Sequence, residues 1–404
     1  MTVSDPTTAS YRRTLAIVSL AHTYSHISIL ALPPVFVLLR AEFGLSGAQL
    51  GLLVTLVSAG MLAQIPLGEV VDRVGAKWPL VAGQALTAVG MGITAAAPSY
   101  RWLVIGAMVV GVGQAPIHPA NYALVATVAP RARLGRSFSV HTFGGYLGFA
   151  IGPLLIGAAA VTVGWRAGLG VVAAVGLAYA VVIAGLLAPL YRTALGAQPV
   201  SPSGGGGPTY SGAIAFLGVF FIVIAAAEKA VQAFTPLFVV DGLAAAVTTG
   251  SNALAVFFTL TAVFVLVGGL LADRTDPRWN IAVATVVTAA ALGVAVEVAP
   301  TTAVTILAVF AVAGAGFGLM FASRDRLVAQ LSADDAVGRS FGFVFTADSL
   351  GGVIAPVALG VVIDLLSVSV AFAITAVTFI AAGALALAQG RGLALRLRSL
   401  AVGR

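Results

Sequence analysis

Long apolar runs fill most of the sequence and are separated by short polar loops. A helix of about 20 apolar residues crosses roughly 30 Å of hydrocarbon, and the runs are close to that length. The pattern predicts an all-α polytopic membrane protein with twelve transmembrane helices and no separate soluble domain. The predicted helices cover residues 14–39, 47–71, 78–97, 101–128, 136–160, 166–190, 212–239, 249–272, 279–298, 302–330, 338–363 and 367–389.

Composition and charge support the membrane assignment. Apolar residues make up 60% and charged residues 9% of the 404 residues, whereas a soluble domain carries about 25% charged residues. Most Lys and Arg residues lie in alternate loops and at the ends of the chain, which carries a net charge of +7. Because cytoplasmic loops hold the excess of basic residues, we expect a multi-pass protein of the cytoplasmic cell membrane with both termini cytoplasmic. This placement argues against a nucleic-acid partner.

Two sequence features exclude common chemistries. Zero cysteines exclude a thiolate metal site and a cysteine nucleophile. The glycine run at 204–207 lacks the Gly-Lys-Ser/Thr ending of a nucleotide-binding loop, which argues against an ATP-driven pump. We therefore expect no enzyme activity, no cofactor and no metal.

A loop signal after the second predicted helix occurs twice. Gly68-Glu-Val-Val-Asp72-Arg73 recurs 201 residues later as Gly269-Leu-Leu-Ala-Asp273-Arg274. Further along, Gly135-Arg-Ser-Phe138 recurs as Gly338-Arg-Ser-Phe341 at a shift of 203. A nearly constant shift through helices and loops predicts two similar halves of six spans in the same orientation, related by an axis along the membrane normal.

One Gly/Ser/Pro tract, Ser201-Pro-Ser-Gly-Gly-Gly-Gly-Pro208, lies between the sixth and seventh predicted helices. Its composition is typical of a flexible linker. The expected domains are an N-terminal six-helix bundle at 1–190, a cytoplasmic linker at 191–211, and a C-terminal bundle with a short basic tail at 212–404.

Few full charges lie at membrane depth, and each costs about 2.5–3.5 kcal/mol in hydrocarbon unless it faces protein or water. Glu228 and Lys229 are adjacent in the seventh helix, and Asp348 lies near the middle of the eleventh. Consecutive helical residues point about 100° apart, so Glu228 and Lys229 are expected to aim at different places. Arg324, Asp325 and Arg326 are candidates either for the cavity or for a structural network at the cytoplasmic mouth, as are His22, Asn121 and His141.

The repeat gives two of these charges uncharged counterparts. At a shift of 203, Asp348 aligns with Gly145 and Arg324 aligns with Asn121. Such asymmetry is expected where a site needs different chemistry in the two halves. A lone buried carboxylate has few structural uses, so Asp348 is a candidate for substrate binding or proton coupling.

All four histidines lie in the first half. His22 and His26 are four residues apart and share one face of the first helix. His26 and His118 lie near the midpoints of the first and fourth helices, and a histidine titrates near neutral pH. The alternative for each histidine is a packing role. His22 is expected nearer the cytoplasm, and His141, in the first turns of the fifth helix, is expected to anchor a loop.

The chain resembles the major facilitator superfamily of transporters over its whole length. The superfamily's signature between helices two and three matches Gly68, Asp72, Arg73, Gly75 and Lys77, although Ala76 stands where a basic residue is usual. The resemblance implies the major facilitator fold, a monomer, and a central cavity lined by the first and fourth helices. Asp72 and Arg73 are interpreted as a gating latch and Lys77 as a headgroup anchor, with Gly269, Asp273 and Arg274 as a second copy of the loop that diverges afterwards.

A narrower resemblance connects His22, the segment Gly113-Gln-Ala-Pro-Ile-His118-Pro119 and the segment His141-Thr-Phe-Gly-Gly145 with the fosmidomycin-resistance branch of drug exporters. The leading hypothesis is a secondary active transporter of a small organic solute with a lean to efflux. It is coupled to protons through Asp348, Glu228 and one or more of His26 and His118, and Lys229 is a further candidate for the same substrate or coupling site. The alternatives are a proton-linked importer of an organic anion or carboxylate and a non-transporting membrane sensor. The expected partners are the solute, protons and the lipid bilayer.

Overall fold

A computed structural model describes residues 8–130, 133–187, 212–272, 274–332 and 337–402, and every regular element in these ranges is helical. Within these ranges, ten helical segments are long and apolar enough to cross a membrane. One of them, Leu134–Leu186, is 53 residues long and holds two successive helices. The helix Lys77–Ala95 supplies a further apolar segment of 19 residues.

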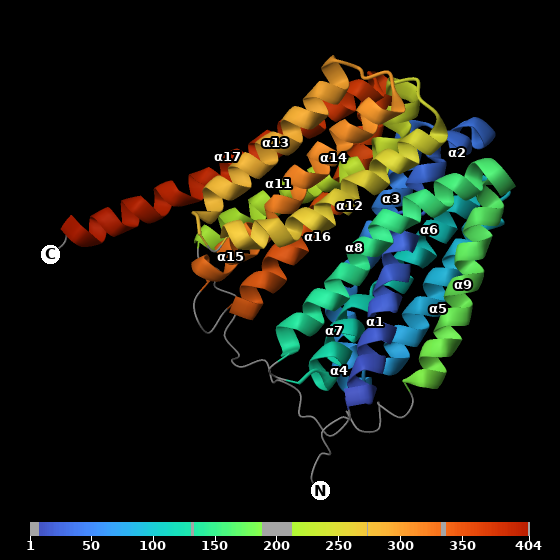
Figure 1. Cartoon of the computed structure of the whole chain (residues 1–404). Helices are drawn as coiled ribbons and strands as arrows, with labels where there is room; N and C mark the ends of the chain where they lie inside the picture. Colours follow the sequence, from blue (N-terminus) through green and yellow to red (C-terminus); the bar gives the residue numbers. More distant parts are fainter. Residues whose placement is uncertain (1–7, 131–132, 188–211, 273, 333–336, 403–404) are drawn as a thin grey trace, which may run out of the picture. The chain divides into compact units, whose positions relative to one another are not determined.

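The chain divides into two compact units, residues 1–45 with 52–204 and residues 46–51 with 205–404. The predicted linker, 191–211, lies outside the described residues. The helices of the first half, in chain order, are α1 (Thr8–Ile29), the 3-10 turn η1 (Pro33–Val35), α2 (Phe36–Phe43), α3 (Gly47–Met61), α4 (Gln64–Val74), α5 (Lys77–Ala95), α6 (Tyr100–Gln114), α7 (Ile117–Val128), α8 (Leu134–Ala159), the π-helical turn η3 (Ala160–Gly164) and α9 (Trp165–Leu186) (Figure 1).

The second half has a matching set of helices. They are α11 (Gly212–Leu237), the π-helical turn η4 (Phe238–Gly242), α12 (Val247–Ala272), α13 (Pro277–Glu297), α14 (Ala303–Leu319), α15 (Phe321–Leu331), α16 (Val337–Leu365) and α17 (Val368–Val402). The pairs α6/α14 and α8/α16 begin 203 residues apart, which is the shift of the sequence repeat. The breaks α6/α7 and α14/α15 also occur at equivalent places.

Glycines let the helices of each unit approach closely at repeated positions. A Cβ added at Gly111 would lie 2.7 Å from a backbone oxygen of α3, and one at Gly113 would lie 2.5 Å from a backbone nitrogen of α5. In the second unit, a Cβ at Gly314 would overlap the backbone of α12, and one at Gly316 would lie 2.7 Å from Thr288 Oγ1 of α13. The sequence repeat is therefore a repeat of backbone-to-backbone helix packing, which small residues permit in membrane helices.

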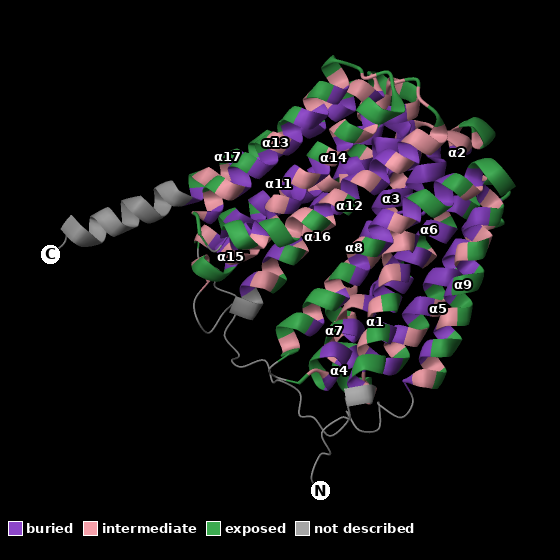
Figure 2. Cartoon of the chain, in the orientation of Figure 1, coloured by how far each residue is buried: buried purple, intermediate pink, exposed green. Residues whose placement is uncertain are grey.

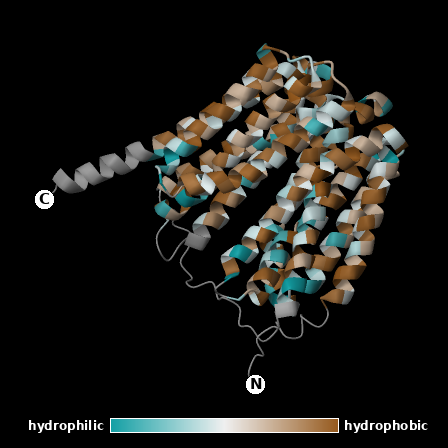
Figure 3. Ribbon diagram, in the orientation of Figure 1, coloured by the Kyte–Doolittle hydropathy of each residue, from teal (hydrophilic) through white to brown (hydrophobic). Residues whose placement is uncertain are grey.

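Apolar residues occupy both the interior and the outside of the helices. In the first unit, α1, α4, α5, α7 and α9 share a buried apolar core that includes Val18, Leu80 and Ile117. Buried and exposed positions alternate along the helices (Figure 2), while apolar residues run along most of their length (Figure 3). Exposed mid-helix residues such as Val181 and Leu266, each 72% accessible, are apolar. An apolar outer surface on long helices is what a lipid environment requires.

Candidate functional site

Four histidines from three helices of the first unit form one cluster. His22 of α1 is its centre, because its Nε2 lies 3.2 Å from Nε2 of His118 in α7 and its Nδ1 lies 2.9 Å from the backbone oxygen of His141 in α8. The ring of His26 lies 4.3 Å from that of His22, as the four-residue spacing predicts. The ring nitrogens of His22, His26 and His118 that could ligate a metal ion lie within 4.8 Å of one another.

The hydrogen bonds of His22 fix where its proton lies. A carbonyl oxygen only accepts, so Nδ1 of His22 donates to the backbone oxygen of His141. In the neutral ring, Nε2 then holds a lone pair, and Nε2 of His118 donates to it. The His22–His118 bond exists only while at least one of these two rings is neutral, because two imidazolium rings would both be donors.

The helix α8 is shaped to receive the ring of His22. A Cβ at Gly145 would lie 2.6 Å from Cε1 of His22 and 2.9 Å from each ring nitrogen, so the ring packs directly on the glycine backbone. The ring of His141 stacks on the ring of His22, with the two centroids 4.2 Å apart. His26 stacks on Phe149 at 3.9 Å, and Tyr122 makes an edge contact with His141 at 5.4 Å.

One expectation about the histidines is corrected by this geometry. His141 was expected to anchor a loop, but its side chain is fully buried and stacks within the cluster. His22 lies beside His26, as the helical spacing predicts, and it also contacts His118. His22 and His141 are buried, whereas His26 and His118 are half-buried, so the accessible side of the cluster lies at His26 and His118.

A second polar group lies on α11 in the second unit. Gln232 Nε2 donates to Glu228 Oε1 at 2.7 Å, and Lys229 Nζ donates to Gln232 Oε1 at 2.7 Å. The expectation that Glu228 and Lys229 aim at different places is wrong, because Gln232 lies four residues after one and three after the other. Positions three and four apart are neighbours on a helix surface, and the long side chains reach the same amide.

Arg324 of α15 is held by an acidic neighbour and aromatic rings. Its Nε donates to Asp325 Oδ1 at 3.0 Å, and its guanidinium carbon lies 4.7 Å from the ring centroid of Phe321 and 5.0 Å from that of Phe221. The side chain is 9% accessible. Cation–π contacts stabilise a guanidinium where water is scarce.

Asp348 of α16 connects the two polar groups of the second unit. The residue as a whole is half-buried, and its carboxylate interacts electrostatically with Glu228, Lys229, Arg324 and Asp325. These five residues from α11, α15 and α16 therefore form one charged group in this unit.

The aligned positions in the first unit carry no charge. Gly145, which aligns with Asp348, leaves room for the ring of His22. Asn121, which aligns with Arg324, is fully buried, and neither polar atom of its side chain has a hydrogen-bond partner among the described residues.

The first loop copy is a helix ending that depends on glycine. The helix α4 stops at Val74, and Gly75 follows with φ +86° and ψ 158°, a backbone conformation that is essentially restricted to glycine. Arg73 pairs with Glu69 of the same helix at 3.3 Å, with both side chains exposed. Asp72 is also exposed, and no atom lies within 4 Å of a Cβ added at Gly68. The latch role of this loop stays a prediction.

The second loop copy ends differently, and the sequence divergence has a structural reason. Asp276 is the N-cap of α13 and accepts from the backbone nitrogen of Arg278 at 2.9 Å, while Pro277 is the first helical residue. Proline at the first position and Asp at the cap are favoured helix starts. Gly269 lies on α12 with nothing within 4 Å of an added Cβ, and Arg274 N–H donates to a carbonyl oxygen of α12. Asp273 lies outside the described residues.

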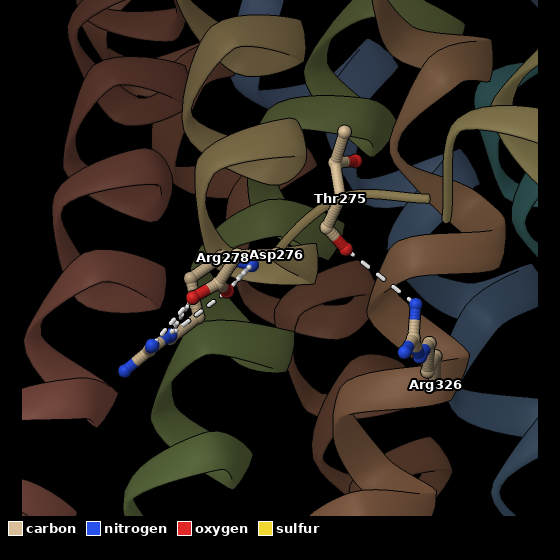
Figure 4. Close-up of polar contacts among 4 residues, drawn as sticks. All are labelled: Thr275, Asp276, Arg278 and Arg326. Carbon is tan, nitrogen blue, oxygen red and sulfur yellow. Dashed lines mark hydrogen bonds and ion pairs between the residues drawn. The ribbon is translucent and has the colours of Figure 1, made fainter. Parts of the chain in front are cut away.

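The expected mouth network of Arg324, Asp325 and Arg326 is split in the structure. Arg326 donates to the backbone oxygen of Thr275 at 3.5 Å, whereas Arg278 folds against Asp276 (Figure 4). The hydrogen bond from the Arg278 guanidinium holds the pKa of Asp276 below its ordinary value, and the charges of Arg278 and Arg326 act in the same direction. Thr275, Asp276, Arg278 and Arg326 line a cavity of about 380 Å³ together with Pro277, Leu327, Gln330, Leu331 and Gln389.

Comparison with known proteins identifies the family. A family model described as Major Facilitator Superfamily matches residues 18–209 and 209–393. The chain belongs to the major facilitator superfamily. The predicted all-α fold with two six-helix bundles is therefore confirmed, as is the resemblance to this superfamily.

Solved superfamily transporters share the fold at low sequence identity. A bacterial homologue of the human lysosomal transporter Spinster, in an inward-facing and occupied conformation, superimposes with a TM-score of 0.78 at 16% identity, covering 94% of this chain and 97% of that chain. The nucleoside transporter NupG superimposes with a TM-score of 0.75 at 13% identity, covering 94% and 99%. Both likenesses concern the fold alone.

Curated relatives match shorter segments. The fosmidomycin resistance protein of Escherichia coli K12 is 31% identical over 142 residues, which is 35% of each chain. A probable L-galactonate transporter of the same organism is 25% identical over 129 residues, 32% of this chain and 28% of that protein. The matched segments thus span about a third of the length of these relatives.

Proposed function

We propose that this membrane transporter is a proton-coupled secondary active transporter that moves a small organic solute across the cytoplasmic membrane by alternating access. The observation that supports this most strongly is the grouping of ionisable side chains at membrane depth. Imidazoles gather around His22 in one unit, and carboxylates and cations gather around Asp348 in the other. Ionisable groups inside membrane spans are costly and mark ion or proton pathways. The basic loops and ends of the chain favour cytoplasmic termini.

Each cluster would respond to a proton in a defined way. Adding a proton to both His22 and His118 leaves two N–H donors facing each other across 3.2 Å, so the rings must separate. Proton uptake at Asp348 removes one negative charge from a group that also holds Glu228, Lys229 and Arg324. In both clusters the proton changes contacts between different helices, which is what coupling to a conformational change requires.

Export of the solute is the favoured direction, supported by similarity to a fosmidomycin resistance protein over a third of the chain. Import of an organic anion is the second candidate. Two cations at membrane depth, Lys229 and Arg324, support it, as does the match to a probable L-galactonate transporter. If the protein imports an organic anion, these cations attract the anion and the carboxylate of Asp348 carries the proton.

Flux measurements in proteoliposomes test both readings. A thermal-shift screen with fosmidomycin, L-galactonate and other organic acids first selects a solute that binds. An antiporter then accumulates that solute in vesicles with an acidic lumen, and a symporter accumulates it in vesicles with an alkaline lumen, whatever the orientation of the protein. Export coupled to proton entry predicts the first result.

Variants test the residues that carry the coupling. We expect Asp348→Asn and His118→Ala to reduce gradient-driven flux at least about tenfold, which corresponds to roughly 1.4 kcal/mol. Asp241→Asn, an exposed carboxylate in η4, is the matched control and keeps the flux. The coupling assignment is wrong if Asp348→Asn and His118→Ala both retain the full flux.

A further inference from the structure

The histidine cluster has the composition and spacing of a metal site. His22, His26 and His118 bring three imidazole nitrogens within 4.8 Å of one another, and all of the ligand atoms in this group are nitrogens. We propose that these three side chains bind one divalent transition-metal ion of the Zn²⁺ class. The absence of cysteine argued against a thiolate site, but it does not bear on an all-imidazole one.

The distance between two of the nitrogens already matches a metal-bound pair. Zinc binds imidazole nitrogen at about 2.0–2.1 Å, so two nitrogens on a tetrahedral ion lie about 3.4 Å apart. Nε2 of His22 and Nε2 of His118 lie 3.2 Å apart. The ion would replace the proton that these two nitrogens share. The nitrogens of the three histidines lie at most 4.8 Å apart, whereas two nitrogens on one zinc ion lie about 3.4 Å apart. The ring of His26 must therefore move by about 1.4 Å at most to bind the same ion.

His22 is also oriented as a metal ligand should be. A ligating histidine usually donates its other ring N–H to a carbonyl or carboxylate, which fixes the tautomer and aims the lone pair at the metal. Nδ1 of His22 donates to the backbone oxygen of His141 at 2.9 Å, leaving Nε2 as the ligand atom. Stacking on the ring of His141 and packing on Gly145 hold the ring in place.

The chemistry of the donors selects the kind of ion. Imidazole suits Zn²⁺, Cu²⁺, Ni²⁺ and Co²⁺, whereas Mg²⁺ and Ca²⁺ prefer oxygen ligands. Three protein ligands leave a fourth tetrahedral position for water or another ligand. His26 and His118 are half-buried, so this position lies on the accessible side of the cluster.

Metal titration of the purified full-length protein in detergent tests the proposal, with an affinity tag that contains no histidine. We expect saturable Zn²⁺ binding at one ion per chain by calorimetry, and visible d–d absorption bands of tetrahedral Co²⁺ that Zn²⁺ displaces. His26→Ala and His118→Ala should each weaken Zn²⁺ binding by more than about 100-fold, because losing a ligand costs more than losing the group that orients one. His141→Gln removes the fourth ring but keeps the backbone carbonyl, so one site per chain should remain.

Three results would overturn the proposal: no saturable Zn²⁺ binding to the wild-type protein, Zn²⁺ binding that survives His118→Ala, or an equal loss in His141→Gln and His118→Ala. If an alanine variant does not fold, His118→Gln and His26→Gln keep the polar volume and remove the ring, and the same losses are expected. Binding is measured without solute or pH gradient, so its failure would leave the transport proposal intact, and a failure of transport would leave the metal site intact.

Discussion

The packing of His22 on Gly145 gives a prediction whose size follows from the structure. In Gly145→Ala, the new Cβ would lie 2.6 Å from Cε1 of His22, although ordinary contacts begin near 3.4 Å. The ring must therefore move by about 0.8 Å. It cannot move without loss, because it stacks on His141 and donates to that residue's backbone oxygen. A displacement of that size takes the 2.9 Å hydrogen bond beyond its effective range.

The cost of Gly145→Ala combines three contributions. Overpacking a filled interior costs about 1–3 kcal/mol, and a lost hydrogen bond costs about 0.5–1.5 kcal/mol. Replacing glycine by alanine inside a helix stabilises the helix by up to about 1 kcal/mol, which offsets part of this cost. We therefore expect a net destabilisation of about 0.5–4.5 kcal/mol.

Thermal unfolding of the purified protein in detergent, followed by intrinsic fluorescence, measures this effect. The matched control is Gly135→Ala, which lies on the same helix, α8, with nothing within 4 Å of the added Cβ. It should leave the Tm unchanged or raise it, whereas Gly145→Ala should lower the Tm and also weaken gradient-driven flux. A Tm for Gly145→Ala equal to or above that of Gly135→Ala would refute the packing argument.

Three further variants test other parts of the structure. Gln232→Leu removes the amide that bonds to both Glu228 and Lys229 on α11. The unfolding free energy should fall by about 1–3 kcal/mol, which lowers the Tm. An unchanged Tm would mean that water replaces the amide. Gly75→Ala should cost about 1–3 kcal/mol because of its φ of +86°, whereas the control Gly68→Ala, inside α4, should not lower the Tm. Asp276→Ala removes the α13 cap and should cost about 0.5–2 kcal/mol. Because Arg278 lowers the pKa of Asp276, the Tm difference between wild type and Asp276→Ala should stay constant from about pH 7 to pH 5. It should shrink only as pH falls below about 4, through the pKa of the folded state; shrinkage near pH 6 would contradict this assignment.

The fold could be predicted from the sequence because the bilayer allows so few solutions. Backbone groups in hydrocarbon must be paired within a helix or a closed β-barrel, and uninterrupted apolar runs of about 20 residues fit the helix. The sequence repeat predicted the two similar halves, and Gly111 and Gly314 contact the backbones of their neighbouring helices in the same way.

The candidate site was predicted less completely because it depends on which helices are neighbours. Helical spacing placed His22 beside His26 correctly, but the contact with His141 requires α1 to lie against α8. One signal was present: a glycine aligned with Asp348 leaves space that a neighbouring side chain can fill. Gln232 was missed although it lies three and four residues from two charges, a spacing that helical geometry makes informative.

Asp348 offers the most direct test of proton coupling, because accumulation and exchange can be measured in the same proteoliposomes. In a proton-coupled transporter, accumulation of the labelled solute against its gradient requires proton movement, whereas exchange of labelled for unlabelled solute requires only binding and alternating access. We predict that Asp348→Asn loses accumulation driven by the pH gradient and keeps exchange. Accumulation at the wild-type level in Asp348→Asn would contradict the assignment of Asp348 as the residue that couples protons to transport.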